Sequence, residues 1–225
     1  MPRAKPSPAA PRPSRARARA SAPVRPYHHG NLRASLLDAA DALLAAHGVQ
    51  GLTLREVARA AGVSHGAPYH HFASLDELLA AVAERGFQVL GDAVAKAVTQ
   101  GDPRERLLRV STAYVGCALA HPERFRLMFG PLLARQDDFP GLRDAAHAAF
   151  RHVATASAAH DDAHAASLAL AGWSLAHGLS HLLIDGALQA LAIQARPEEL
   201  ARTLATHLLG SAPAPAGRRA AAPRR

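Results

Sequence analysis

The stretch at residues 52–72, LTLREVARAAGVSHGAPYHHF, constrains the fold of this chain more than any other part of it. Its apolar residues first recur at helical spacing. Thr53, with Glu56 three residues later, has the pattern of a capping box at the start of a helix. Gly62 stands where a helix ends in a left-handed residue. The stretch therefore predicts a short helix that begins after Thr53 and ends before Gly62.

The residues after Gly62 predict a second helix, from His65 to about His71, with Ser64 as its N-cap. Pro68 is compatible with this helix only because it falls in the first turn. Two short helices joined by a glycine turn form a helix-turn-helix, whose second helix enters the major groove of DNA. Small residues at the start of the second helix leave its N–H groups accessible to phosphates or base edges. Double-stranded DNA is therefore the predicted partner.

The run GVSHGAPYHHFASLDELL resembles the core signature of the TetR/AcrR family of transcriptional regulators, G-V-S-x-G-x-x-Y-x-H-F. Upstream, YHHGNLRASLLDAADALLAAHGVQGLTL resembles the first helix of that family. The W-x-x-x-H-G at 173–178, with HPERFRLMFG before it, resembles a recurrent C-terminal domain type of the family, the WHG type. The likeness covers about residues 27–210. One departure is Leu75, where the family usually has a lysine, so that phosphate contact is not expected.

This resemblance implies an all-α fold in which a three-helix DNA-binding head, at 27–74, precedes a helical bundle for ligand binding and dimerisation, at 75–210. It also implies most of the DNA contacts. Arg33 and His70 are added because each offers a hydrogen-bond donor to a phosphate. The full predicted set is Arg33, Thr53, Ser64, His65, Gly66, Ala67, Tyr69, His70 and His71.

The net charge of +8 comes from the two ends of the chain. Residues 1–26 carry seven basic residues and residues 211–225 carry four, with no acidic residue in either. The remaining chain, 27–210, holds fifteen basic and eighteen acidic residues. Both ends are rich in Pro, Ala and Arg and are predicted to be disordered. The first is either an arm that follows DNA phosphates or a solvated extension, and the sequence leaves both readings open.

Outside the helix-turn-helix, apolar periodicity separated by Gly and Pro predicts the remaining helices. The glycines at 86 and 91 are expected to interrupt or bend the long helix that contains them. The last two helices are expected to pair with their copies across a two-fold axis, giving a homodimer. The expected helices lie at about 31–46, 75–98, 104–120, 122–129, 139–159, 161–191 and 197–209.

Aromatic and polar residues of the bundle predict a pocket for a small apolar ligand between its helices. Any one of them can equally be an ordinary core residue. Trp173 and His177 are the strongest candidates, because a buried indole N–H and a buried imidazole each need a hydrogen-bond partner. The predicted lining is Phe87, Tyr114, Cys117, Phe125, Met128, Phe129, Phe150, Trp173 and His177.

Metal binding and catalysis are not predicted. His160 with His164, and His177 with His181, have the i, i+4 spacing of zinc ligands, but no third ligand stands at a matching distance. No phosphate-binding loop, nucleophile elbow or paired carboxylate occurs, so an enzyme is not expected, nor is a cofactor.

Composition also bounds the compartment. The single cysteine excludes a disulfide framework and fits a reducing compartment. No apolar run is expected to reach the length of a membrane span, and no apolar core follows the basic N-terminal residues as in a secretory signal. A cytoplasmic protein is therefore expected.

Together these features predict a homodimeric regulator, in the first instance a repressor, that binds a palindromic operator and is released by a small apolar ligand. The alternative is a DNA-binding protein without an effector, which would keep the head but lack a ligand cavity. An enzyme is the remaining class.

Overall fold

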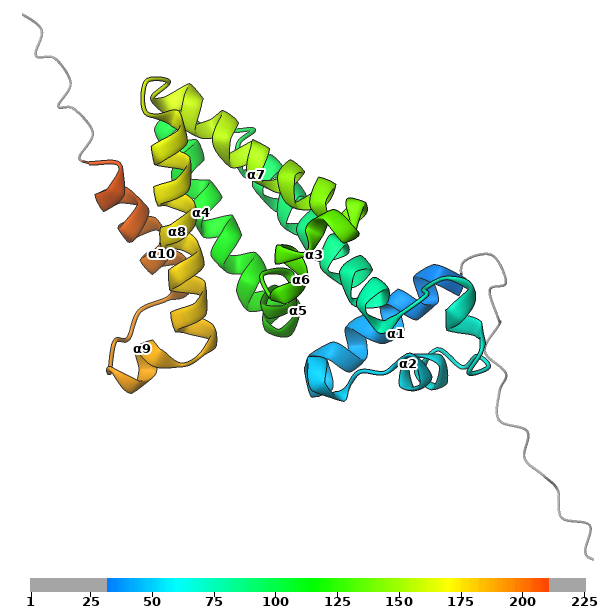
Figure 1. Ribbon diagram of the computed structural model, residues 1–225. Helices are drawn as coiled ribbons and strands as arrows, with labels where there is room; N and C mark the ends of the chain where they lie inside the picture. The colour runs from blue at the N-terminus through cyan, green and yellow to red at the C-terminus, as the bar shows by residue number, and fades with distance from the viewer. Residues whose placement is uncertain (1–31, 211–225) are drawn as a thin grey trace, which may run out of the picture. The chain divides into compact units, whose positions relative to one another are not determined.

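The computed structural model describes residues 32–210, and every regular element among them is helical (Figure 1). The expected all-α fold is confirmed. Residues 1–31 and 211–225, and with them both basic ends, lie outside the described residues. The elements are α1 (Leu32–His47), η1 (Val49–Gly51), α2 (Leu54–Ala60), η2 (Ala67–His70), α3 (Leu75–Ala97), α4 (Pro103–Ala120), α5 (Pro122–Met128), α6 (Pro131–Ala134), η3 (Gln136–Asp138), α7 (Pro140–His160), α8 (Ala165–Ile184), α9 (Ala187–Ala190) and α10 (Pro197–Leu208).

The first helices close around a small apolar core. Leu36 and Leu44 of α1 and Val57 and Ala58 of α2 are each almost wholly buried. Phe72, which follows η2, is 1% exposed and completes this core. Burial of such side chains is the main contribution to the stability of a unit this small. Within this region α2 packs against η2, and the Arg33 guanidinium of α1 lies over the Phe72 ring at 5.4 Å.

Side-chain caps set the starts of three helices. Thr53 Oγ1 accepts a hydrogen bond from the Glu56 backbone N–H at 3.1 Å and donates to Glu56 Oε2 at 3.0 Å, which confirms the capping interpretation. Ser74 caps α3 by accepting from the backbone N–H of Glu77. Asp102 caps α4 in the same manner. These caps satisfy backbone donors that the helices leave unpaired.

The expectation that glycines interrupt the long helix α3 is wrong, because α3 continues from Leu75 to Ala97. A Cβ atom at Gly86 would lie 2.5 Å from Met128 Sδ, and one at Gly91 would lie 3.5 Å from Ala149 Cα. Gly86 therefore leaves room for the Met128 side chain of α5, whereas a methyl group at Gly91 would make an ordinary contact with α7.

The expected helix at 161–191 is also wrong at both ends, since α8 begins at Ala165 and ends at Ile184. Asp161 accepts hydrogen bonds from the backbone N–H and the ring of His164, a local turn that competes with helix. Gly186 has a φ of 71°, and this left-handed residue separates α8 from α9.

By length and composition α8 is apolar enough to cross a membrane, and it is the one helix within 32–210 that meets that test. This differs from the expectation that no apolar run reaches such a length. A single helix of this kind is weak support for a membrane span, because core helices pass the same test. Here α8 packs against α4, α7 and α10.

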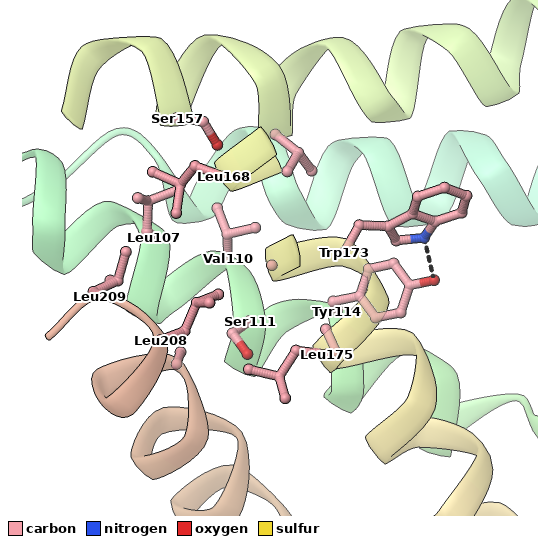
Figure 2. A pocket seen from close by; sticks show the side chains of 14 residues that line it. Leu107, Val110, Ser111, Tyr114, Ser157, Leu168, Trp173, Leu175, Leu208 and Leu209 are labelled. Atoms are coloured by element: carbon pink, nitrogen blue, oxygen red, sulfur yellow. Dashed lines mark hydrogen bonds between the residues drawn. The ribbon is translucent and has the colours of Figure 1, made fainter. Parts of the chain in front are cut away.

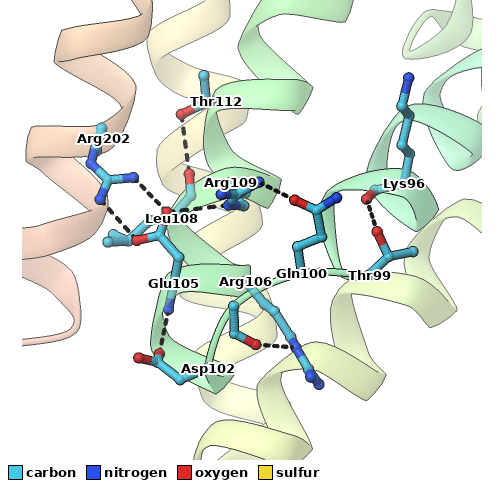
Figure 3. Close-up of polar contacts among 11 residues, drawn as sticks. Lys96, Thr99, Gln100, Asp102, Glu105, Arg106, Leu108, Arg109, Thr112 and Arg202 are labelled. Atoms are coloured by element: carbon cyan, nitrogen blue, oxygen red, sulfur yellow. Dashed lines mark hydrogen bonds and ion pairs between the residues drawn. The ribbon is translucent and has the colours of Figure 1, made fainter.

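The bundle is built from α3, α4, α7, α8 and α10, with the broadest contact between α3 and α7. Polar contacts join the last helix to α4 (Figure 3). Arg202 of α10 donates two hydrogen bonds to the Glu105 carboxylate, at 2.8 and 3.0 Å. The Ser111 hydroxyl, which is buried, donates to the backbone carbonyl of Ala201 at 3.3 Å. These contacts hold α10 beside α4.

Candidate DNA interface and ligand cavity

The expected second helix at 65–71 is not an α-helix but a 3₁₀-helix, Ala67–His70. The Tyr69 N–H bonds the carbonyl of Gly66, three residues back, at 3.2 Å. Pro68 accounts for this, because it has no N–H and disfavours an α conformation in the residue before it. Pro68 is also fully buried, so it anchors this segment to the core.

The turn before this segment ends α2 as predicted. Gly62 has a φ of 71°, its N–H bonds the Arg59 carbonyl, and the Val63 N–H bonds the Ala58 carbonyl at 3.0 Å. This is the Schellman pattern of a helix end. The expectation that Ser64 is an N-cap is wrong: the cap position is Gly66, and no side chain bonds there. The Pro68 effect shifts the helix start by two residues.

Most of the predicted DNA contacts are exposed on one continuous segment and the elements beside it. Tyr69 is 61% exposed. Ala67 is half-buried. The Thr53 hydroxyl already donates to Glu56, so in this conformation its proton is not available to a phosphate. The exposed members are Arg33, Thr53, Ser64, His65, Gly66, Tyr69, His70 and His71.

In the bundle, three side chains form a hydrogen-bonded chain. The Trp173 indole N–H donates to the Tyr114 hydroxyl oxygen at 3.1 Å, and that hydroxyl lies 3.0 Å from His177 Nδ1. Because the indole is only a donor, all three groups are satisfied when Tyr114 donates to a neutral His177. The sequence-based argument that Trp173 and His177 need partners is met by Tyr114, which the same prediction included.

Burial keeps the side chains of Tyr114, His177 and Cys117 in their uncharged forms. Burial lowers the pKa of His177, with a further contribution from His181. Burial raises the pKa of the Tyr114 hydroxyl well above its ordinary value. Burial likewise raises the pKa of the Cys117 thiol. All three groups therefore stay neutral at pH 7.

A cavity of about 230 Å³ lies beside this chain of hydrogen bonds, between α3, α4, α7 and α8. Five of the predicted pocket residues line it together: Phe87, Tyr114, Phe129, Phe150 and Trp173. Sequence reasoning missed the rest of the lining. Two of these residues, Leu90 and Val94, could have been predicted from the sequence, because they follow Phe87 at helical spacing. The other missed residues are Leu133, Gln136, Ala146, His147, Ala149 and Val153.

The other four predicted pocket residues do not line this cavity. His177 is not a lining residue, but it is hydrogen-bonded to Tyr114, which lines the cavity. The remaining three, Cys117, Phe125 and Met128, surround a separate space of only about 10 Å³. Phe125 still reaches the cavity wall indirectly, because its ring packs on Phe129 with a centroid distance of 5.0 Å.

Ion pairs connect the helices around the cavity to α1. Arg124 of α5 donates to Asp41 of α1 at 2.9 Å, and the two side chains are only 17% and 15% exposed. Arg85 of α3 pairs with Asp38 at 2.8 Å and lies 3.6 Å from Asp41. Among the described residues, 33–210 belong to one compact unit, so these pairs lie within a single packed body. Breaking a buried pair on one side is costly.

In the part of the chain that the structure describes, no group of three or more His, Cys, Asp or Glu side chains is placed to hold a metal ion. Neither of the two histidine pairs belongs to such a group. His164 pairs with Asp161, and His177 bonds Tyr114.

Comparisons with known proteins agree with this arrangement. The model for bacterial regulatory proteins of the tetR family matches residues 36–82, and that for the tetracyclin repressor-like C-terminal domain matches residues 107–208. The structure of a protein with unknown function from Rhodococcus sp. RHA1 is 33% identical, with a TM-score of 0.70 over 83% of this chain and 97% of that one.

Two further relatives carry functional names. The multidrug binding protein EbrR, solved in complex with imidazole, is 27% identical, with a TM-score of 0.56 over 84% of this chain and 94% of that one. The HTH-type transcriptional regulator BetI of Rhizobium meliloti (strain 1021) is 40% identical over 86 residues, which are 35% of this chain and 41% of that protein. The match with BetI thus spans less than half of its length. With the two family models and the fold in agreement, the chain belongs to the TetR family of DNA-binding transcriptional regulators.

Proposed function

We propose that this regulator is a repressor that binds a palindromic operator as a homodimer and leaves it when a small apolar ligand fills the 230 Å³ cavity. The observation that carries the proposal is the link from the cavity wall to α1, through the Phe129–Phe125 ring contact and the Arg124–Asp41 ion pair. A cavity so connected gives a ligand a means of changing the position of the DNA-binding residues. In the cell this places the protein in the cytoplasm, where the DNA is.

The connection runs through two adjacent residues of α5. Phe129 lines the cavity and packs on Phe125. Arg124, the residue before Phe125, pairs with Asp41 of α1. A ligand that displaces the Phe129 ring therefore strains the α5–α1 contact. Such a ligand shifts the protein only in so far as it binds one arrangement more tightly than the other.

The lining defines the class of ligand. None of the cavity residues is an aspartate, glutamate, lysine or arginine, so a charged ligand would lie unpaired among aromatic rings. An apolar cavity of roughly 150 Å³ is known to hold benzene. This larger cavity therefore fits a neutral apolar molecule somewhat bigger than benzene. Its relative EbrR, named as a multidrug binding protein, supports a small-molecule role for this site.

The homodimer is supported by apolar side chains on the outer face of the last long helices. Leu170 and Leu182 of α8 are 54% and 47% exposed, and Leu208 of α10 is 39% exposed. Between the two leucines, the exposed residues Ser174 and Gly178 continue the same face at four-residue spacing. A stripe of leucines and small residues suits a second copy packed against it.

Selection of bound sequences from a random pool of double-stranded DNA tests the proposal. We expect a two-fold symmetric motif, with half-sites about one turn or roughly 34–36 Å apart in the simplest case. Two dimers on overlapping sites would give a wider spacing. Recovery of no motif, or of a single asymmetric site, would refute the dimeric repressor and favour a DNA-binding protein of another kind.

A further inference from the structure

A second, smaller cavity of about 40 Å³ lies among α4, α7, α8 and α10 (Figure 2). Holding one water molecule takes roughly 10–15 Å³ on the same measure, so the space accommodates a group of a few atoms. Its walls are leucine, valine, alanine and glycine, with three hydroxyl groups and one indole. None of its lining residues carries a formal charge at pH 7.

One hydroxyl in this second cavity has no partner. Ser157 of α7 is 1% exposed, and its Oγ makes no hydrogen bond within residues 32–210. Figure 2 shows this oxygen directed away from α7 toward the cavity side chains. Across the space, Ser111 is different, because its hydroxyl donates to the Ala201 carbonyl. Buried hydroxyls without partners are rare and costly, so Ser157 is the group in this cavity that a bound molecule would satisfy.

The two cavities share a wall. Tyr114, Val153 and Trp173 line both of them. The hydrogen bond from the Trp173 indole to the Tyr114 hydroxyl, visible in Figure 2, spans this wall and holds its two aromatic rings together. Trp173 is half-buried, so one part of its ring faces solvent rather than the packed interior. Separating the two rings would join the spaces into one elongated site.

We propose that the second cavity is the terminal compartment of the ligand site, and that its Ser157 hydroxyl binds the polar end of an elongated, uncharged ligand. This inference rests on the proposed ligand cavity. The apolar body of the ligand fills the larger space, and a terminal hydroxyl or carbonyl group passes between Tyr114 and Trp173 to reach Ser157. The ligand class is thus an uncharged amphiphile such as a long primary alcohol, rather than a compact ring alone.

The chain offers variants that alter the second compartment alone. Ser157→Ala removes the unpartnered hydroxyl and should leave the fold at least as stable, because no hydrogen bond is lost. Gly172→Ala adds a methyl group whose carbon would lie 3.9 Å from Leu208 Cδ2, an ordinary contact, inside the second cavity. Neither residue lines the larger cavity. Ser111→Ala is the matched control, since it removes a hydroxyl that is already paired.

The test uses the full-length protein and the 1-alkanols from 1-hexanol to 1-dodecanol, with binding measured by calorimetry. Each buried CH₂ group contributes about 0.8 kcal/mol, so the affinity should rise about fourfold per carbon. We expect this rise to continue to the longest alkanols in the wild type. The protein has one tryptophan, Trp173, so its fluorescence reports on the shared wall alone. Its emission should shift only with the longer alkanols.

For the longest alkanols, Ser157→Ala should lower the affinity about tenfold and Gly172→Ala should shorten the length at which affinity stops rising. Short alkanols, and 1-chloroalkanes of any length, should bind Ser157→Ala as they bind the wild type, because they make no hydrogen bond to Ser157. Ser111→Ala should not reproduce the length-dependent loss. A single cooperative melting transition establishes that each variant is folded, with Ser111→Ala expected to melt at a lower temperature because it loses the bond to the Ala201 carbonyl.

Two outcomes would overturn the inference. If affinity levels off at the same length in the wild type and both variants, without a change in Trp173 emission, the second cavity takes no part in binding. In that case short alkanols that still release the operator would leave the proposed repressor function standing. If no alkanol binds at all, the larger cavity is not an apolar ligand site, and both proposals fail together.

Discussion

The head, here residues 32–74, and the bundle that follows it place their polar groups in opposite directions. In the head, a closed core of leucine, valine and phenylalanine supports polar side chains that face solvent, such as Tyr69. In the bundle, Tyr114, Trp173 and His177 turn inward and bond to one another beside a cavity. A DNA-reading surface has to hold its geometry, whereas a ligand site has to exist in two arrangements. In the proposed function, the head reads the operator and the bundle responds to the ligand.

Removal of the indole at the cavity wall should have the largest effect on the bundle. Trp173→Ala is expected to lower the free energy of unfolding by about 3 kcal/mol, since the ring is partly exposed, and to abolish the response to ligand. In the protein that remains folded, the operator motif should not change. Chemical unfolding measured beside operator release, with Trp173→Phe as the control, checks this. Early unfolding with a normal ligand response would show that Trp173 is only a core residue.

If the seven basic residues of 1–26 lie along DNA phosphates, deletion of this segment should have the largest effect on DNA binding. The head itself is balanced in charge, with Arg33, Arg55 and Arg59 against three acidic residues, so it releases few counterions alone. The deletion should flatten the salt dependence of log K by about two to four units, at about 0.9 per phosphate neutralised. The preferred motif should stay nearly the same. Binding titrations of the full-length and truncated proteins at several salt concentrations test this. Parallel slopes for the two proteins would show that residues 1–26 do not contact the DNA phosphates.

Within the head, the Tyr69 hydroxyl is expected to position the protein on DNA, whereas Ala67 is expected to affect which base sequence is bound. Tyr69→Phe should weaken binding to all sequences alike by about 1.5–3 kcal/mol, because the hydroxyl is expected to bond a charged phosphate. Substitution of Ala67, by contrast, should change which bases are preferred. Binding assays on a panel of operator variants measure both. A changed motif at constant overall affinity in Tyr69→Phe would reverse the two roles.

The contact between bundle and head can be weakened without touching either site. Arg124→Gln should reduce the coupling between ligand and operator by about 0.5–2 kcal/mol, because it removes the charge that pairs with Asp41. The affinity for ligand alone should not change. Arg126→Gln is the matched control on the same helix, since Arg126 pairs with Asp185 of the bundle instead. Equal coupling in both variants would exclude this contact as the route.

The smallest expected effect is that of pH on the bundle. Burial lowers the pKa of His177 in the folded protein below its unfolded value of about 6.5. The unfolded chain therefore takes up the proton first as pH falls. The stability that neutral His177 contributes is fully present above about pH 6.5 and is lost as pH falls through the lowered pKa. Melting temperatures of the wild type and His177→Gln between pH 7.5 and 5 should diverge, and parallel curves would contradict this.

The head could be predicted closely because its signals are local in the chain. The Thr53 N-cap and the left-handed Gly62 need only their own neighbours, and both form as expected. The prediction of an α-helix after them was wrong because of Pro68, which has no backbone N–H and disfavours the α conformation in the residue before it. The segment is a 3₁₀-helix instead.

The cavity could be predicted only in part, because it combines side chains from distant segments. Phe87, Tyr114 and Trp173 were identified by residue type, yet which of the aromatic residues face the same space depends on packing. Phe125 is one helical turn from Phe129, and only Phe129 lines the cavity. Gly86 and Gly91 show the same limit, since their role depends on Met128 and Ala149, which lie far along the chain.

The central claim is that occupancy of the cavity and binding of the operator oppose each other. The most direct measurement is the dissociation constant of a neutral apolar dye, N-phenyl-1-naphthylamine, for the full-length protein with and without saturating operator DNA. Coupling is reciprocal, so saturating dye should weaken operator binding by the same factor as operator weakens dye binding. We expect that factor to be about 5–150, the usual range for such coupling. Identical dye affinity in the presence and absence of operator, or no dye binding to the free protein, would contradict the account.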